Sequence, residues 1–163
     1  MNSILYNPKY QQYYQKIQSL EADRKFCGHT MEHFLAVARL SFIMVLEAGL
    51  DIDKEVVYAT ALLHDIGRGL EYTDGIPHHE GSVMIAQEIL PECGFDEVEK
   101  DEIILAIAKH REVAGEECRK ATDKDDFATI FYRADKLSRN CFDCRVADKC
   151  NWPAHKKNKE ITL

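Results

Sequence analysis

The chain has 163 residues, of which 45% are hydrophobic, and its formal net charge is −7 at pH 7. This length suffices for one domain with a real core, and the hydrophobic share is the globular norm, which argues against intrinsic disorder. The acidic balance argues against nucleic acid as a bulk partner, because duplex binding draws on an excess of Lys and Arg.

The N-terminus lacks a basic stretch followed by an apolar one, which is the pattern of a secretory signal. No run of about 18 apolar residues occurs, so the sequence predicts no membrane span. We therefore expect a cytoplasmic protein whose six cysteines stay reduced or bind metal.

Apolar residues recur every three or four positions in several segments, and this spacing predicts helices. In chain order the predicted helices are residues 9–21, 30–48, 53–66, 79–90, 96–110 and 124–139. Gly49 and Gly67 follow two of them as stop signals, and Asp53 is a candidate N-cap. Residues 68–77 are expected to form a loop, and the tail from Cys141 should be irregular.

Alternating β-branched runs are absent, so the expected fold class is all-α. Short connections favour a compact single-domain bundle of about six helices. The first helix carries Tyr10, Tyr13 and Tyr14, which could form the surface of a homodimer or a cover over the core.

Four polar residues occupy positions where a soluble helix normally carries Leu or Ala: His33, His64, Asp65 and Asp135. Each could be an unrelated, hydrogen-bonded core residue, which is the commoner explanation for a single buried His. Buried without partners, however, each would cost about 2–7 kcal/mol or more. One divalent cation removes this cost for all four, so the sequence predicts a metal site.

Two imidazoles and two carboxylates suit Fe, Mn, Ni, Co or Zn, and suit Mg less well. Four protein ligands leave positions on an octahedral ion for a phosphate oxygen and for a water molecule. Because the metal lowers the pKa of that water, the pattern indicates a hydrolytic site that needs no Ser or Cys nucleophile.

The segments EHFLAVARL, LLHDIGRG and RADKLSR, in this order, resemble the signature of the HD superfamily of metal-dependent phosphohydrolases. The resemblance covers roughly residues 25–140 and implies a helical core, a divalent metal and hydrolysis of a phosphomonoester or phosphodiester. It aligns His33 with the first ligand of the family, which leaves His29 off register. The doublet His64-Asp65 and the distant Asp135 complete the ligand set.

The resemblance divides the chain into three parts. Residues 1–24 would form an N-terminal helix that packs on the core, residues 25–140 the HD domain, and residues 141–163 a tail that contains cysteines.

Further histidines occur in many HD proteins, where they bind a second metal or contact phosphate. His78 and His110 match these positions. The alternative is that His110 is a satisfied core residue and His78 a loop residue at a helix start. His79 is the neighbour most easily mistaken for a ligand.

Charged residues next to the predicted ligands are candidates for contacts with substrate. Arg68 and Lys136 directly follow the metal motifs and could bind phosphate. Glu71 and Asp74 could act as general acid or base beside the catalytic Asp65. Solvated surface charges are the alternative for each.

Cys141, Cys144, Cys150 and His155 have the spacing C-x2-C-x5-C-x4-H, which could hold a structural zinc ion. The alternative is reduced thiols that pack inward. The other cysteines, Cys27, Cys93 and Cys118, are scattered along the chain and suggest no site.

The sequence thus favours a phosphohydrolase that acts on a small phosphate ester, foremost a nucleotide. One alternative is a binuclear phosphodiesterase or dinucleoside polyphosphatase, which would use His78 and His110. A catalytically silent, metal-bound binding module and an oxygenase of the di-iron type are further alternatives. The sequence does not identify the substrate.

Overall fold

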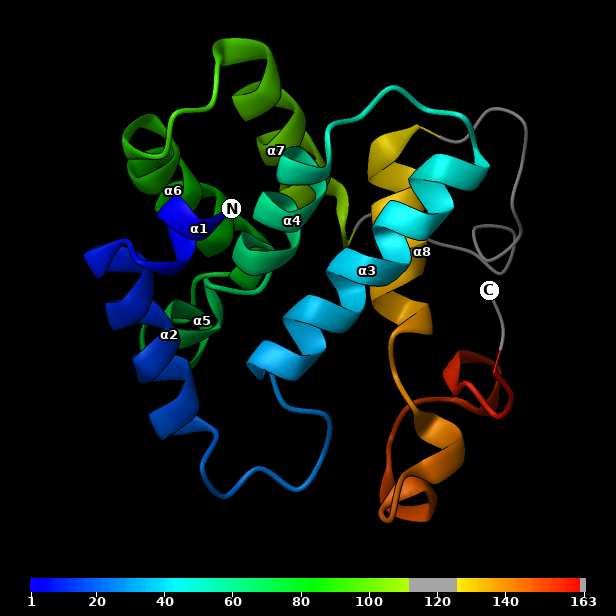
Figure 1. Ribbon diagram of the computed structural model, residues 1–163. Coiled ribbons are helices and arrows are strands. Elements are labelled where there is room, and N and C mark those ends of the chain that lie inside the picture. Colours follow the sequence, from blue (N-terminus) through cyan, green and yellow to red (C-terminus); the bar gives the residue numbers. More distant parts are fainter. Residues whose placement is uncertain (112–125, 162–163) are drawn as a thin grey trace.

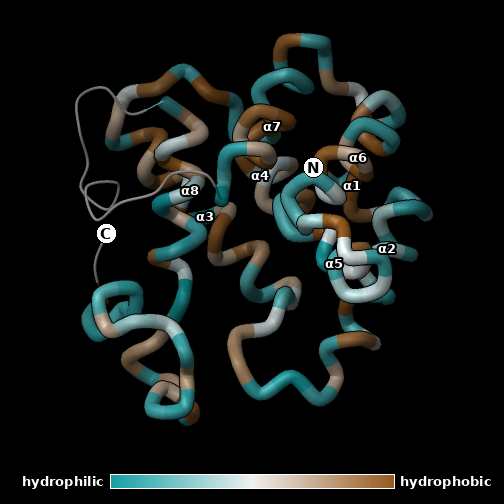
Figure 2. The backbone as a smooth tube through the Cα atoms, turned by 180° about the vertical axis from the view of Figure 1, so that it is seen from behind, coloured by the Kyte–Doolittle hydropathy of each residue, from teal (hydrophilic) through white to brown (hydrophobic). Residues whose placement is uncertain are grey.

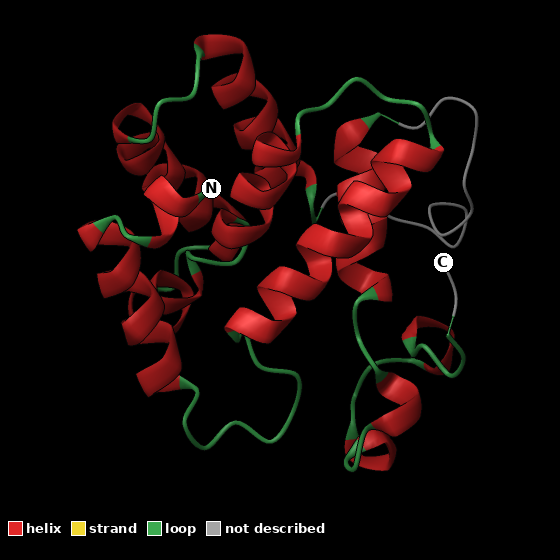
Figure 3. Ribbon diagram, viewed as in Figure 1, coloured by secondary structure: helices red, strands yellow, loops and turns green. Residues whose placement is uncertain are grey.

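The computed structural model describes residues 1–111 and 126–161, and every regular element in these residues is a helix (Figures 1 and 3). The expected all-α class is therefore confirmed. No helix within the described ranges is long and apolar enough to cross a lipid bilayer.

The α-helices follow one another with short connections. Their bounds are Asn2–Leu5 (α1), Pro8–Leu20 (α2), Met31–Glu47 (α3), Lys54–Leu63 (α4), Arg68–Asp74 (α5), His78–Ile89 (α6), Glu97–Lys109 (α7) and Phe127–Leu137 (α8). The six predicted helices correspond to α2, α3, α4, α6, α7 and α8. Residues 124–125, the expected start of the last one, and Cys118 lie outside the described residues.

The prediction of a loop over residues 68–77 was wrong, because Arg68–Asp74 forms α5. Gly75 ends this helix in the left-handed conformation (φ 72°). Helix α5 packs on α2 and α6, so tertiary contacts stabilise a segment that is too short to be helical alone. Helix α4 ends at Leu63, and the His-Asp doublet therefore lies in the turn that follows it.

Polar caps fix where the two helices nearest the site begin. The Thr30 hydroxyl accepts a hydrogen bond from the backbone N–H of His33, so that His33 lies in the first turn of α3. The Asp126 carboxylate caps α8 in the same way through the backbone N–H of Thr129. Each cap contributes about 1 kcal/mol and sets the rotation of the helix that carries a predicted ligand.

The core lies where α3, α4, α7 and α8 pack against one another, with α6 beside α7. Figure 2 shows hydrophobic stretches alternating with hydrophilic ones along these helices, as expected for elements with one buried face. Helix α2 buries Tyr10 and Ile17 completely and so covers this core. The predicted homodimer stays a prediction.

Beyond α8 the chain turns through three short 3₁₀ helices, Cys141–Asp143, Ala147–Lys149 and Ala154–Lys156. Asn158 fastens this segment to α8, because its amide donates hydrogen bonds to the carbonyls of Lys136, Leu137 and Arg139 at 2.7, 3.2 and 2.9 Å. The C-terminal segment therefore lies beside the helix end that carries Asp135.

Candidate metal centre

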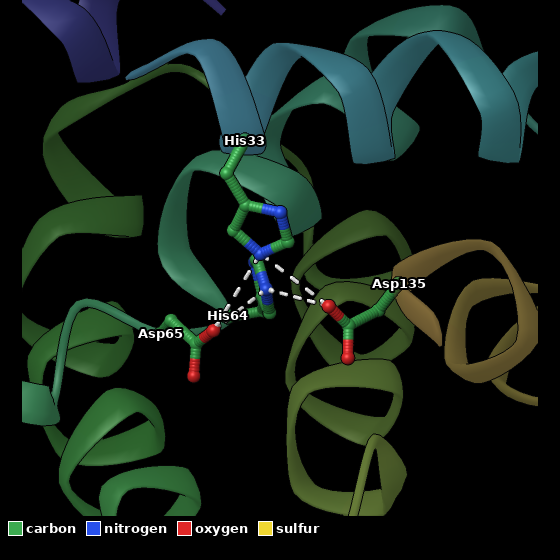
Figure 4. Close-up of side chains that lie close together, drawn as sticks. All are labelled: His33, His64, Asp65 and Asp135. Carbon is green, nitrogen blue, oxygen red and sulfur yellow. Dashed lines mark ion pairs between the residues drawn. The ribbon is translucent and has the colours of Figure 1, made fainter. Parts of the chain in front are cut away.

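Four buried side chains from three parts of the chain meet in the core (Figure 4). His33 comes from α3, His64 and Asp65 from the turn after α4, and Asp135 from α8. Their ligand atoms all lie within 4.8 Å of one another. The shortest distance between a His and an Asp of this group joins His64 Nε2 to Asp65 Oδ2 at 3.1 Å, and His33 Nε2 lies 3.4 Å from Asp135 Oδ1.

Three atoms at the centre of this group have no hydrogen-bond partner among the described residues, namely His33 Nε2, His64 Nε2 and Asp135 Oδ1. Such buried polar atoms are costly and rare in folded proteins. The Nδ1 atoms of the two histidines do have hydrogen-bond partners. His64 Nδ1 lies 2.7 Å from the Ala61 carbonyl, and His33 Nδ1 lies 3.3 Å from the Ser138 hydroxyl. An outer partner on Nδ1 that leaves Nε2 facing inward is the usual arrangement of metal-binding histidines.

The electrostatics of the group also favour a cation. Burial raises the pKa values of Asp65 and Asp135, but neighbouring histidines and cations outweigh it and hold both well below their usual range. Burial lowers the pKa of His64, yet the two carboxylates overcome this and raise it to about 9. The site therefore stabilises positive charge, which a divalent metal would supply.

A second buried group adjoins the first and consists of Asp65, His78 and His110. Asp65 Oδ1 lies 3.5 Å from His78 Nε2 and 3.8 Å from His110 Nε2. The two Nε2 atoms are 3.2 Å apart, while the Nδ1 atom of His110 lies 2.5 Å from the Ile107 carbonyl. Burial lowers the pKa of His78 to about 3, so the ring is neutral and able to bind a metal. The two oxygens of Asp65 thus face two different groups.

Both groups border one pocket of about 850 Å³. Among the described residues that line it, Asp65 and Asp135 carry the only carboxylates. The cationic lining residues are Arg24, Arg68, Arg111, Lys136, Arg139, Lys156 and Lys157. The aromatic residues Phe26, Tyr132 and Trp152 also line the pocket. A chain with a net charge of −7 therefore concentrates positive charge around its buried histidines.

Three charged residues that the sequence singled out already have partners. Arg68 donates to Asp65 Oδ1 at 3.1 Å and to Glu71 Oε2 at 2.7 Å, and Lys136 donates to Asp135 Oδ2 at 2.5 Å. Both cations border the pocket. Their first interaction is with the candidate ligands, and whether they also bind phosphate stays a prediction.

Glu71 lies 3.1 Å from His78 Nδ1. Partial burial raises the pKa of Glu71, but the hydrogen bond with His78 and the charge of Arg68 outweigh it and lower the pKa to about 2. An ionised carboxylate on Nδ1 orients a ligand histidine, which favours a positioning role for Glu71 over a general acid. Asp74 and His79 belong to neither group of candidate ligands.

Sequence reasoning missed three neighbours of the centre. His29 is buried, its Nε2 lies 3.5 Å from Asp65 Oδ2, and its Nδ1 lies 2.5 Å from Glu21 Oε1. Arg139 lies 3.6 Å from Asp135 Oδ1 and Arg111 3.4 Å from Glu71 Oε1. The ion pairs of Arg111 and Arg139 could have been suspected, because Arg111 follows His110 and Arg139 lies near Asp135 in the sequence. The position of His29 beside Asp65 could be known only from the fold.

The predicted zinc ligands Cys141, Cys144, Cys150 and His155 all line the same pocket. No three of them, however, have ligand atoms within 4.8 Å of one another, so the structure brings them to one wall without closing a tetrahedral site. The structural zinc site stays a prediction.

Comparisons with known proteins agree with this geometry. The family model of the HD domain matches residues 30–140. A protein of Clostridium beijerinckii is 42% identical over 98% of this chain and 96% of its own length. Ribonuclease Y of Nitratidesulfovibrio vulgaris is 34% identical over 53% of this chain, but the match spans only 15% of that enzyme. The crystal structure of a predicted HD superfamily hydrolase from an uncultured Thermotogales bacterium superposes with a TM-score of 0.61, covers 92% of this chain and 82% of that chain, and is 23% identical, so it shows the fold alone.

Proposed function

Since the chain belongs to the HD domain family of metal-dependent phosphohydrolases, we propose that it hydrolyses a small phosphate ester, foremost a nucleotide, at a binuclear metal centre. His33, His64, Asp65 and Asp135 would hold one metal. His78 and His110 would hold the second, and Asp65 would serve both.

The observation that carries this proposal is the position of Asp65. Its Oδ2 faces His33 and His64 at 3.8 and 3.1 Å, and its Oδ1 faces His78 at 3.5 Å. A single carboxylate between two sets of inward-facing imidazole nitrogens suits a pair of cations better than one. This favours the binuclear alternative over the mononuclear site that the four-residue motif alone suggests.

Fe or Mn suits such mixed imidazole and carboxylate ligands best, with Ni, Co and Zn as alternatives. Two bound cations would neutralise the charge of the phosphate. They would also lower the pKa of a metal-bound water molecule to near neutral. Arg68 holds Asp65 through Oδ1 and Lys136 holds Asp135 through Oδ2, so both ligand carboxylates are oriented before substrate arrives. Glu71 orients His78 in the same manner.

The pocket lining supports a phosphorylated substrate with an apolar or aromatic part. The described carboxylates of the lining are the candidate metal ligands, so the Arg and Lys side chains around the pocket can attract and orient phosphate oxygens. Tyr132 and Trp152, on α8 and the C-terminal segment, offer flat faces on which a nucleobase can stack.

The test is a count of metals per chain by elemental analysis, combined with hydrolysis assays. The assays would use p-nitrophenyl phosphate, bis-p-nitrophenyl phosphate and a panel of nucleotides, with Mn²⁺ or Fe²⁺ added. At this centre, not counting any metal bound by the cysteines, we expect two metals in the wild type, about one in His78→Ala, and none in Asp65→Ala. Hydrolysis should fall by a factor of at least about 10² in both variants, which is typical when part of a catalytic unit is lost.

His79→Ala is the matched control, because His79 adjoins His78 in sequence yet belongs to neither group. It should keep both metals and full activity. One metal in the wild type that is unaffected by His78→Ala would refute the binuclear centre, and hydrolysis by metal-free Asp65→Ala would refute the mechanism altogether.

A further inference from the structure

Four cysteines from two distant parts of the chain line the outer part of the pocket. Cys27 lies in the connection between α2 and α3, and Cys141, Cys144 and Cys150 lie in the C-terminal segment. Cys27, Cys141 and Cys144 also line a second, adjoining hollow, and the described residues around it include none of the buried histidines. None of the four is buried, and none forms a disulfide.

The C-terminal segment lacks the apolar packing that would hold it in place. Among residues 141–161 only Asn158 is buried, and no hydrophobic side chain of this segment belongs to the core. Backbone turns and the hydrogen bonds of Lys157 stabilise the segment internally, and the hydrogen bonds of Asn158 hold it against α8. Segments without a core are usually stabilised by disulfides or by metal ligation, and thiolate ligation contributes folding free energy directly.

The charge around these cysteines suits a negatively charged centre. Lys25 and Arg145 line the smaller hollow together with Cys27, Cys141 and Cys144, and none of the described residues around it carries a carboxylate. In the larger pocket the two carboxylates are the candidate ligands Asp65 and Asp135. A metal centre that carries four thiolates is anionic, and neighbouring cations stabilise it.

We infer that Cys27, Cys141, Cys144 and Cys150 are the four thiolate ligands of an iron–sulfur cluster that joins the connection before α3 to the C-terminal segment. Cys27 takes the fourth position that the spacing in sequence alone gave to His155. All-thiolate ligation is the usual form for such clusters. The four thiols lose their protons on binding, and the iron and sulfide come from outside the chain.

The arrangement of the cysteines favours a cluster over a single zinc ion. With Zn–S bonds of about 2.3 Å in a tetrahedron, the sulfurs of a zinc site stand about 3.8 Å apart. No three of the four cysteine sulfurs lie within 4.8 Å of one another. In a four-iron cluster each thiolate binds its own iron, so the sulfurs stand further apart and surround a larger body.

The position of this site connects it to the catalytic pocket. Cys27 is two residues from His29, whose ring lies 3.5 Å from Asp65. Cys141 begins the first 3₁₀ helix after α8, the helix that carries Asp135. The cluster would hold the outer wall of the pocket, including Trp152, against the rest of the domain.

The test is to purify the whole protein without oxygen and to measure iron, acid-labile sulfide and visible absorbance, before and after reconstitution with ferrous iron and sulfide. Catalytic metals bring no sulfide, so the readout is independent of the proposed hydrolase centre. We expect sulfide in the wild type and in Asp65→Ala, and its loss in Cys27→Ser and Cys144→Ser. Far-ultraviolet circular dichroism would check that these variants keep their helices.

The control variants are Cys93→Ser and His155→Ala. Cys93 lies after α6 and lines neither hollow, so both controls should keep their sulfide. Wild-type protein that holds no sulfide after reconstitution would overturn the inference. So would a single zinc ion that survives Cys27→Ser and is lost in His155→Ala, because this result would restore the ligand set suggested by sequence spacing.

Discussion

Gly67, in the turn after the His-Asp doublet, is the position where one added methyl group should disturb the site most. A Cβ atom there would lie 2.3 Å from the His78 carbonyl oxygen and 2.3 Å from the Ser82 nitrogen. Both are backbone atoms of α6, so neither can rotate away. Gly67→Ala must therefore push α6 away from the turn that carries Asp65.

The magnitude follows from ordinary contact distances. Non-bonded carbon atoms pack at about 3.5–4.0 Å, so the backbone would have to separate by about 1 Å. Overpacking of this kind costs about 1–3 kcal/mol. The hydrogen bond from the Gly67 N–H to the Ser82 hydroxyl (2.9 Å) would weaken as well, at about 1 kcal/mol. We expect a loss of about 3 kcal/mol in the free energy of unfolding.

The same displacement would move His78 relative to Asp65. A shift of about 1 Å in a catalytic geometry can cost about 10² in rate, so metal binding by the second group and hydrolysis should both fall. Urea unfolding followed by circular dichroism gives the stability, and elemental analysis gives the metal content.

Gly69→Ala is the matched control two residues along the chain. The atoms nearest to its Cβ would belong to the flexible side chain of Lys16, at 3.3 Å or more, and alanine favours the helix by up to about 1 kcal/mol. This variant should be as stable as the wild type or slightly more so. If Gly67→Ala matched Gly69→Ala in stability and metal content, the close approach of Gly67 to the backbone of α6 would not be what positions His78.

Further predictions concern single side chains. His64→Ala should lose the metal of the first group while circular dichroism shows the helices intact. His29→Ala should keep both metals, because His29 belongs to neither group, and an empty centre would contradict the ligand assignment. Burial raises the pKa of Glu21, but hydrogen bonds from His29 and Tyr72 outweigh it and lower the pKa to about 2 from 4.5. Glu21 should therefore contribute up to roughly 3 kcal/mol of stability above its unfolded-state pKa, lost as the pH falls through the folded value. Urea midpoints at a series of pH values should show a weaker acid dependence in Glu21→Gln, and an identical dependence would contradict this. Asn158→Ala should release the C-terminal segment, which limited proteolysis after α8 would detect as faster cleavage at unchanged helicity.

Much of the fold and the first group of ligands could be predicted from the sequence, because both depend on local order. The recurrence of apolar residues every three or four positions is a property of neighbouring residues. It predicted the helices α2, α3, α4, α6, α7 and α8. The placement of His33, the His-Asp doublet and Asp135 on apolar segments indicated burial, and burial of such groups requires a cation or partners. Helix α5 was missed because its stability comes from packing on α2 and α6.

What the sequence could not determine are distances between parts of the chain that meet only after packing. Only the tertiary structure turned the two oxygens of Asp65 toward two sets of histidines and placed Glu71 on His78. It also gathered the cations of an acidic chain around one pocket and set Cys27 beside the C-terminal cysteines. Each residue type was visible in the sequence, but its partner was not, because helix packing decides which side chains face each other.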